Sequence, residues 1–150
     1  GFVPTCLVST NGKTGFGDVD PIKKIETLCK EFDIFLHIDA AWAGAAMILP
    51  EHRSMADGIE LADSIVINPH KWLLTNFDCS AHFVKDPTAL TSTLSILPEY
   101  LKSKESEDII DYRDWSIPLG RRFRALKLWF VIRYYGVGGL QKMIRKHRLI

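Results

Sequence analysis

Three short apolar runs, each followed by a polar residue or loop, constrain the fold of this chain more than any other feature. The runs cover 5–9, 34–38 and 64–67, and a helical pattern with Ile22, Ile25 and Leu28 separates the first two. Strands that alternate with a helix are typical of an α/β sheet with parallel members. We therefore expect an α/β fold with a mostly parallel sheet and flanking helices, to which the apolar run 81–84 adds a further strand.

Helix boundaries are also indicated by the sequence. Asp20 is a residue type that caps helices, and Pro21 suits the first turn of a helix. A long amphipathic helix is expected over about 121–135, and 140–150 continues a helical pattern. The charged segment 101–111 is expected to be an exposed loop.

The balance of charge excludes several classes of partner. The chain has 19 Lys and Arg residues and 18 Asp and Glu residues, which argues against a general polyanion binder. Basic residues at 121–127 alternate with apolar ones as on an amphipathic helix, so we expect no nucleic acid partner. No apolar run approaches the roughly 20 residues of a membrane helix, so no membrane partner is expected.

Cysteine and histidine spacing indicates neither a disulfide framework nor a metal site. Cys6, Cys29 and Cys79 are widely spaced and odd in number, which favours reduced, mostly buried thiols and a cytoplasmic protein. The five histidines lack a ligand spacing, so no metal is expected. The sequence starts within an apparent strand and ends within an apparent helix, from which we expect a fragment of a longer protein.

Candidate binding residues follow the carboxyl ends of the expected strands. Thr14 lies in the loop after the first strand, Asp39 ends the second, and Lys71 closely follows the third. Ligands of open α/β sheets bind beyond the carboxyl ends of the strands. This shared location groups the three residues as a candidate site.

Lys71 and Asp39 also have simpler structural interpretations. A single lysine is most often exposed, and Lys71 becomes a nucleophile only if its amine loses a proton, which the flanking apolar residues favour. Asp39 could cap a helix, or it could meet a cation such as the pyridinium nitrogen of pyridoxal phosphate. Ala41 is small enough for a flat ring to lie against the backbone.

Four sequence strings carry a resemblance to a known family. NPHKW at 68–72 with NFDCS at 76–80 resembles the lysine motif of the aromatic L-amino acid decarboxylases. These are group II decarboxylases among the fold-type I pyridoxal-phosphate enzymes. The match continues in HIDAAWAG at 37–44, DYRDW at 111–115 and PLGRRFR at 118–124. It covers essentially the whole chain in the family's order, which four chance matches would not reproduce.

The resemblance implies how pyridoxal 5'-phosphate is held. Lys71 would carry the cofactor on its amine, and Asp39 would pair with the pyridine nitrogen. The other cofactor-binding residues that it implies are Ala41, Thr14, Asn68 and His70. The family's Gly-Thr-Thr turn reads Gly12-Lys13-Thr14 here, so a lysine replaces one threonine and its orientation is left open.

The resemblance also implies the chemistry, with Lys71, His70 and Tyr100 as catalytic residues. Tyr100 aligns with a loop tyrosine that returns a proton to Cα after carbon dioxide leaves. Related plant aldehyde synthases carry Phe there, so Tyr100 favours simple decarboxylation of an aromatic amino acid. Gly120 aligns with a position that carries Gly in many indole-accepting relatives, which suggests room for a larger ring.

The same resemblance predicts a domain organisation. Residues 1–97 would be part of the cofactor-binding large domain, 98–116 a mobile catalytic loop with its approach, and 117–150 a helix leading towards the small domain. A homodimer is expected for the full-length protein. Two alternatives stay open: an aromatic aldehyde synthase on the same scaffold, and a catalytically incomplete fragment that serves as an interaction module.

Overall fold

The computed structural model describes residues 1–13, 15–95, 110 and 112–147. The chain divides into two compact units, one of residues 1–85 with 123–150 and one of residues 86–122. Thr14 and Tyr100 lie outside the described residues, so their expected roles stay predictions. The predicted division at 97 and 116 refers to a longer protein and also stays a prediction.

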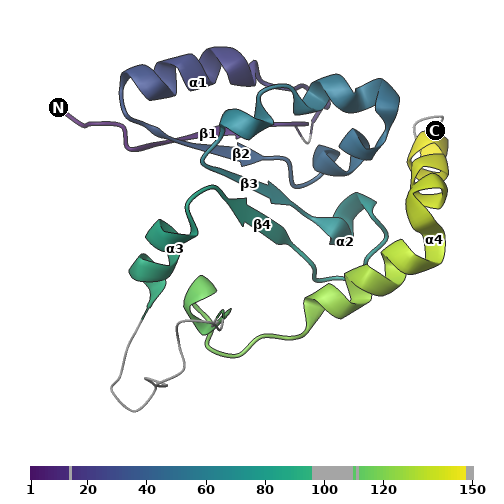
Figure 1. The fold of residues 1–150 in the computed structure, drawn as a ribbon. Coiled ribbons are helices and arrows are strands. Elements are labelled where there is room, and N and C mark those ends of the chain that lie inside the picture. Colours follow the sequence, from purple (N-terminus) through teal and green to yellow (C-terminus); the bar gives the residue numbers. More distant parts are fainter. Residues whose placement is uncertain (14, 96–109, 111, 148–150) are drawn as a thin grey trace. The chain divides into compact units, whose positions relative to one another are not determined.

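A four-stranded sheet forms the centre of the first unit (Figure 1). In chain order its strands are β1 (Cys6–Thr10), β2 (Phe35–Asp39), β3 (Ser64–Ile67) and β4 (Ala81–Val84). They are neighbours in the same order; β1, β2 and β3 run parallel, and β4 runs antiparallel to β3. The expected mostly parallel sheet is confirmed. β4 is antiparallel because the β3–β4 connection contains only one helical turn, α2 (Pro69–Trp72), and no crossover helix.

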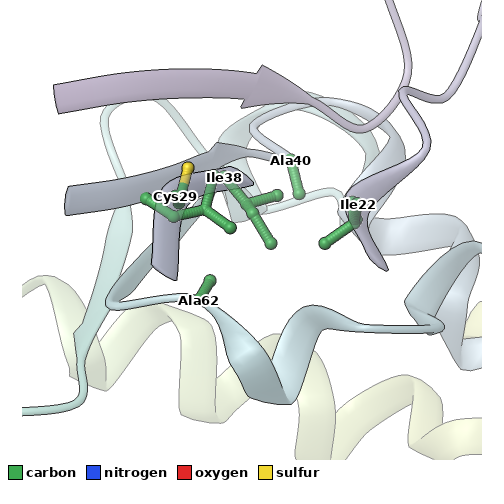
Figure 2. Packing of buried hydrophobic residues seen from close by; sticks show 6 residues of the cluster. Ile22, Cys29, Ile38, Ala40 and Ala62 are labelled. Atoms are coloured by element: carbon green, nitrogen blue, oxygen red, sulfur yellow. The ribbon is translucent and has the colours of Figure 1, made fainter. Parts of the chain in front are cut away.

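One face of the sheet packs against α1 (Ile22–Glu31), where the main core forms. Figure 2 shows this cluster, whose buried members are Ile22, Cys29, Leu36, Ile38, Ala40 and Ala62. Leu28, expected on the apolar face of the helix, is 53% exposed, whereas Cys29 is buried. At about 100° per residue, Cys29 rather than Leu28 stays close to the direction of Ile22. Of the three free thiols, those of Cys29 and Cys79 are buried and that of Cys6 is exposed.

Asp20 does not cap α1, contrary to the sequence prediction. The N-cap residue is Pro21, which makes no side-chain capping hydrogen bond. The Asp20 carboxylate instead accepts a hydrogen bond from the Thr10 N–H at 2.8 Å and pairs with Lys13 at 2.9 Å. These contacts close the loop after β1, and the pKa of Asp20 is lowered, mainly by the Thr10 N–H and then by Lys13.

Three 3-10 segments connect β2 to β3: η1 (Ala43–Ile48), η2 (Pro50–Ala56) and η3 (Ile59–Leu61). A second, smaller core lies beside them. It contains the buried residues Ala45, Leu49 and Ile144, with Ile48, Trp72 and Leu73 packed around them. This cluster joins the chain that follows β2 to the chain that follows Lys71.

The last helix, α4 (Arg124–His147), supplies Ile144 to that smaller core. The sequence prediction of about 121–135 placed its start three residues early, and its end agrees with a break in the helix at Gly136. Gly136 has non-helical backbone angles (φ 60°, ψ 175°), so α4 is two helical pieces joined at this residue. No helix in the described ranges is long and apolar enough to cross a membrane.

The second unit contains α3 (Pro87–Leu94) and η5 (Tyr112–Trp115). Asp86 caps α3, because its side chain accepts a hydrogen bond from the Thr88 N–H at 2.9 Å. Arg121 donates a hydrogen bond to the Tyr112 carbonyl at 2.8 Å and so links the chain after η5 to the start of η5.

Candidate active site at the carboxyl edge of the sheet

Backbone hydrogen bonds join the carboxyl ends of the three parallel strands. The Asn11 N–H donates to the Asp39 carbonyl at 2.9 Å, which fixes the end of β1 against that of β2. The Asn68 N–H donates to the Ala41 carbonyl at 2.9 Å, which fixes the residue after β3 against the residues after β2. The structure therefore brings Asp39, Ala41 and Asn68 to one edge of the sheet.

The Asp39 carboxylate makes a local hydrogen bond and does not cap a helix. Its Oδ1 accepts from the Ala41 N–H at 3.0 Å. η1 begins only at Ala43, and its N-cap residue, Trp42, makes no side-chain cap. Among the described residues Asp39 forms no salt bridge, so this part of the chain supplies no cationic partner at the strand end. That arrangement suits a ligand that brings its own positive charge.

His37 lies two residues before Asp39 on the same face of β2. Its Nδ1 is 2.7 Å from the Ser64 Oγ, and its ring lies edge-on to His82 with centroids 5.8 Å apart. Burial lowers the pKa of His37, and His82 lowers it further, although Asp39 opposes the shift. A pKa below the ordinary 6.5 leaves the imidazole neutral at pH 7. His37 therefore does not neutralise Asp39.

Lys71 lies on α2, one short loop after β3 (Figure 1). Its backbone N–H donates to the Asn68 carbonyl at 2.9 Å, and Pro69 at the first helical position is buried. Lys71 is exposed in the part of the chain that the structure describes, so its apolar sequence neighbours do not bury it here. Trp72 and Leu73 turn into the smaller core instead.

Residues after α2 hold the side chains of Asn68 and His70. The Ser80 hydroxyl donates to the Asn68 Oδ1 at 2.6 Å. The His70 Nδ1 lies 2.9 Å from the Cys79 amide nitrogen and 2.7 Å from the Cys79 carbonyl oxygen. Nδ1 accepts from the amide when it is unprotonated and donates to the carbonyl when it is protonated. The Phe77 ring packs edge-on to His70 at 4.8 Å, so the imidazole is fixed through one edge and one face.

The loop after β1 approaches the chain after Asp39 very closely. Gly12 has φ +96°, and a Cβ atom placed on it would lie 2.1 Å from the Cβ of Ala43. Only glycine fits both the backbone angle and this contact. The Lys13 amine pairs with the Asp20 carboxylate, which raises the pKa of the amine. The Lys13 side chain is therefore directed towards Asp20, which settles the orientation that the sequence left open.

A comparison with known proteins decides the family. The model of the pyridoxal-dependent decarboxylase conserved domain matches residues 1–149. The chain belongs to this family. It is 52% identical over 149 residues to an aromatic-L-amino-acid decarboxylase of Sus scrofa, which covers 98% of the chain and 31% of that relative. The chain therefore spans about a third of the length of such relatives.

Solved structures agree with this assignment. The chain resembles Oryza sativa TDC with PLP and tryptamine (TM-score 0.91, 46% identity, 95% of the chain, 30% of that chain). It also resembles Rhodiola rosea 4-hydroxyphenylacetaldehyde synthase (TM-score 0.83, 44% identity, 95% of the chain, 28% of that chain). The predicted resemblance and the fold-type I architecture are confirmed.

Several contacts at this edge were not found from the sequence. The indole rings of Trp42 and Trp72 stack, and the Trp72 Nε1–H donates to the His147 Nδ1 at 3.1 Å. The string at 76–80 is part of the family motif, but its hydrogen bonds to Asn68 and His70 depend on tertiary structure. These hydrogen bonds join residues that are close in the folded chain, and neither periodicity nor residue spacing predicts such contacts.

Gly120, the expected specificity residue, lies in the second unit. It is exposed, and a Cβ atom placed on it would meet no heavy atom within 4 Å. Packing within the described residues therefore does not require glycine at this position.

Proposed function

We propose that the full-length protein decarboxylates an aromatic L-amino acid to the arylalkylamine and carbon dioxide, with pyridoxal 5'-phosphate as cofactor. The observation that carries this proposal is the placement of Asp39 at the end of β2 and of Lys71 just after the neighbouring strand β3. Ligands of parallel sheets bind at this edge, and family membership points to the same cofactor.

The residues at the edge fit the cofactor on structural grounds. Asp39 has no salt bridge within the described chain, and a protonated pyridine nitrogen would supply the missing cation. When bound, pyridoxal phosphate supplies an electron sink for the electron pair left on Cα. Asp39 would keep the ring nitrogen protonated, and each pKa unit of that stabilisation corresponds to about 1.4 kcal/mol.

Lys71 and the other residues near this edge of the sheet have the remaining proposed roles. Lys71 would hold the cofactor covalently through its amine. Asn68, Thr14 and His70 would hold the cofactor, and the small side chain of Ala41 would let its flat ring lie against the backbone. His70 also contributes to catalysis from its position next to Lys71.

Tyr100 is proposed to return the proton to Cα after carbon dioxide leaves, and Gly120 to leave space for the aromatic ring of the substrate. A phenol can donate this proton when it is held against the carbon. Tyr100→Phe should raise the share of aldehyde among the products. An unchanged product ratio would contradict this role.

The direct test of the activity is a substrate profile of the full-length protein. Carbon dioxide and amine release are measured with Dopa, tyrosine, tryptophan, phenylalanine and 5-hydroxytryptophan. We expect equal amounts of amine and carbon dioxide with at least one of them. Absence of carbon dioxide release with all five, from protein supplied with pyridoxal phosphate, would overturn the proposal.

An aromatic aldehyde synthase is the second candidate, supported by the similarity to the Rhodiola rosea protein. That reaction releases ammonia and hydrogen peroxide in addition to carbon dioxide. Measuring these two products in the same assay separates the candidates, and we expect neither in amounts that match carbon dioxide.

The full-length protein is further proposed to be a cytoplasmic homodimer. Support comes from the family and from three free cysteines, since disulfides are rare in the cytosol. Sedimentation at several protein concentrations tests the dimer. A monomer that retains full activity would contradict it.

A further inference from the structure

The first residue of α4 binds the chain that follows Lys71. This post-lysine segment, residues 76–79, has no helical or strand structure of its own. Arg124 donates two hydrogen bonds to the Asp78 Oδ2, from Nε at 3.1 Å and from an Nη atom at 2.8 Å. The two side chains are 33% and 34% exposed, so the ion pair is partly shielded from water.

Two further contacts fix the same segment to the start of α4. The Lys127 Nζ donates to the Asn76 carbonyl at 2.8 Å, one helical turn after Arg124. The Cys79 thiol points at the Arg124 carbonyl, with the sulfur 4.0 Å from the oxygen. The post-lysine segment is thus held at its beginning, its middle and its end by one turn of α4.

The end of this segment in turn holds His70. Both polar backbone groups of Cys79 lie within hydrogen-bonding distance of the His70 Nδ1, at 2.9 Å and 2.7 Å. The Cys79 carbonyl also accepts from the His70 backbone N–H at 3.2 Å. A displacement of residue 79 therefore changes the position of the imidazole and the partner that Nδ1 can use.

We propose that Arg124 is a positioning residue that sets the orientation of His70, and the Cys79 backbone group that its Nδ1 contacts, through Asp78 and Cys79. The inference rests on the proposed function, because His70, the residue that Arg124 positions, belongs to the proposed active site. Among the described residues, the hydrogen bonds and the ion pair of Arg124 go to Asp78 and Cys79 and not to a proposed cofactor ligand, so its effect passes through the post-lysine segment.

A guanidinium suits this task better than an ammonium. Its planar fork places two donors on one carboxylate oxygen and so fixes direction as well as distance. Lysine at 124 would keep the charge but could not reproduce the fork. A purely structural ion pair would instead affect the stability of the fold and leave the chemistry of His70 unchanged.

The chain offers a matched control on the same helix. Arg145 forms a fork with Glu51 near the other end of α4, with donor–acceptor distances of 2.6 Å and 2.8 Å. This pair has no contact with His70 or with the post-lysine segment. Arg145→Gln thus removes a comparable ion pair without disturbing the proposed connection.

The test uses full-length holoenzyme of the wild type, Arg124→Gln, Arg124→Lys, Asp78→Asn and Arg145→Gln. The pH dependence of the absorbance of bound cofactor is recorded without substrate, and kcat and KM are measured beside it. We expect Arg124→Gln and Asp78→Asn to shift the absorbance titration and to lower kcat on the order of 10- to 100-fold, with KM changed less. Arg124→Lys should be intermediate, and Arg145→Gln should match the wild type in both measurements.

The outcomes separate this inference from the proposed function. A wild type without a cofactor band or carbon dioxide release would overturn both. An active wild type in which Arg124→Gln behaves like Arg145→Gln, or loses only stability, would overturn the positioning role alone. If Arg124→Gln does not fold, Asp78→Asn decides: an unshifted titration with an unchanged kcat contradicts the proposal.

Discussion

The indole rings of Trp42 and Trp72 stack with their centroids 4.9 Å apart and their planes within 9° of parallel. Trp42 follows Asp39 by three residues, and Trp72 directly follows Lys71. The stack therefore joins the segment that carries the carboxylate to the segment that carries the amine. It acts in addition to the backbone hydrogen bond between Asn68 and Ala41.

This stack should appear as an energetic coupling between the two rings. In the full-length protein we expect Trp42→Ala and Trp72→Ala to be non-additive, with a coupling of about 0.5–1.5 kcal/mol, as for other aromatic pairs. Urea unfolding of the two single variants and the double variant measures it. Additive losses would show that the rings do not stabilise each other.

The close approach at Gly12 predicts a strong dependence on residue size. Gly12 and Gly17 both have positive φ, so Gly→Ala should cost about 1–2 kcal/mol at either position from backbone strain. Only at Gly12 would the new Cβ overlap Ala43, which should add about 1–3 kcal/mol. Unfolding free energies of the two variants test this difference. Equal losses would contradict the contact with Ala43.

The ion pair of Glu51 and Arg145 predicts a defined pH dependence. The hydrogen bond from Arg145 lowers the pKa of Glu51 from 4.5 to about 2. Because the folded pKa lies below the unfolded one, this stabilisation is complete above about pH 4.5 and is lost as the pH falls towards 2. The Arg145→Gln variant should therefore be less stable than the wild type near neutral pH.

Urea unfolding at pH 7, 5, 4 and 3 measures this effect. The stability difference between the two proteins should be constant from pH 7 to 5 and should shrink below that. Both side chains are about half exposed (45% and 40%), so added salt should also reduce the difference. A difference that grows on acidification would contradict the assigned pair.

The fold could be predicted from the sequence where local patterns match the tertiary structure. Apolar runs identified the parallel strands, and the polar residues after them identified the edge where both Asp39 and Asn68 lie. The assignment failed where a side chain serves a distant partner. Asp20 has the chemistry of a helix cap, but it binds Thr10 and Lys13 instead.

The supports of the candidate site could not be predicted for the same reason. Asp78 and Arg124 are far apart in the sequence, and their ion pair depends on how α4 packs. The exposure of Lys71 likewise depends on which neighbours turn inwards, and Trp72 and Leu73 do so while Lys71 does not. Sequence patterns indicate which face of a helix or strand is buried, but not which distant residue packs against that face.

The most direct test of the central claim is the absorbance of cofactor bound to the full-length Lys71→Ala protein. Carbon dioxide release is measured beside it, and Lys24→Ala, an exposed lysine on α1, is the control. We predict that Lys71→Ala loses both the band of covalently held cofactor and turnover, whereas Lys24→Ala keeps both. A Lys71→Ala protein that retains the band and the activity would contradict the assignment of this lysine and of the site built around it.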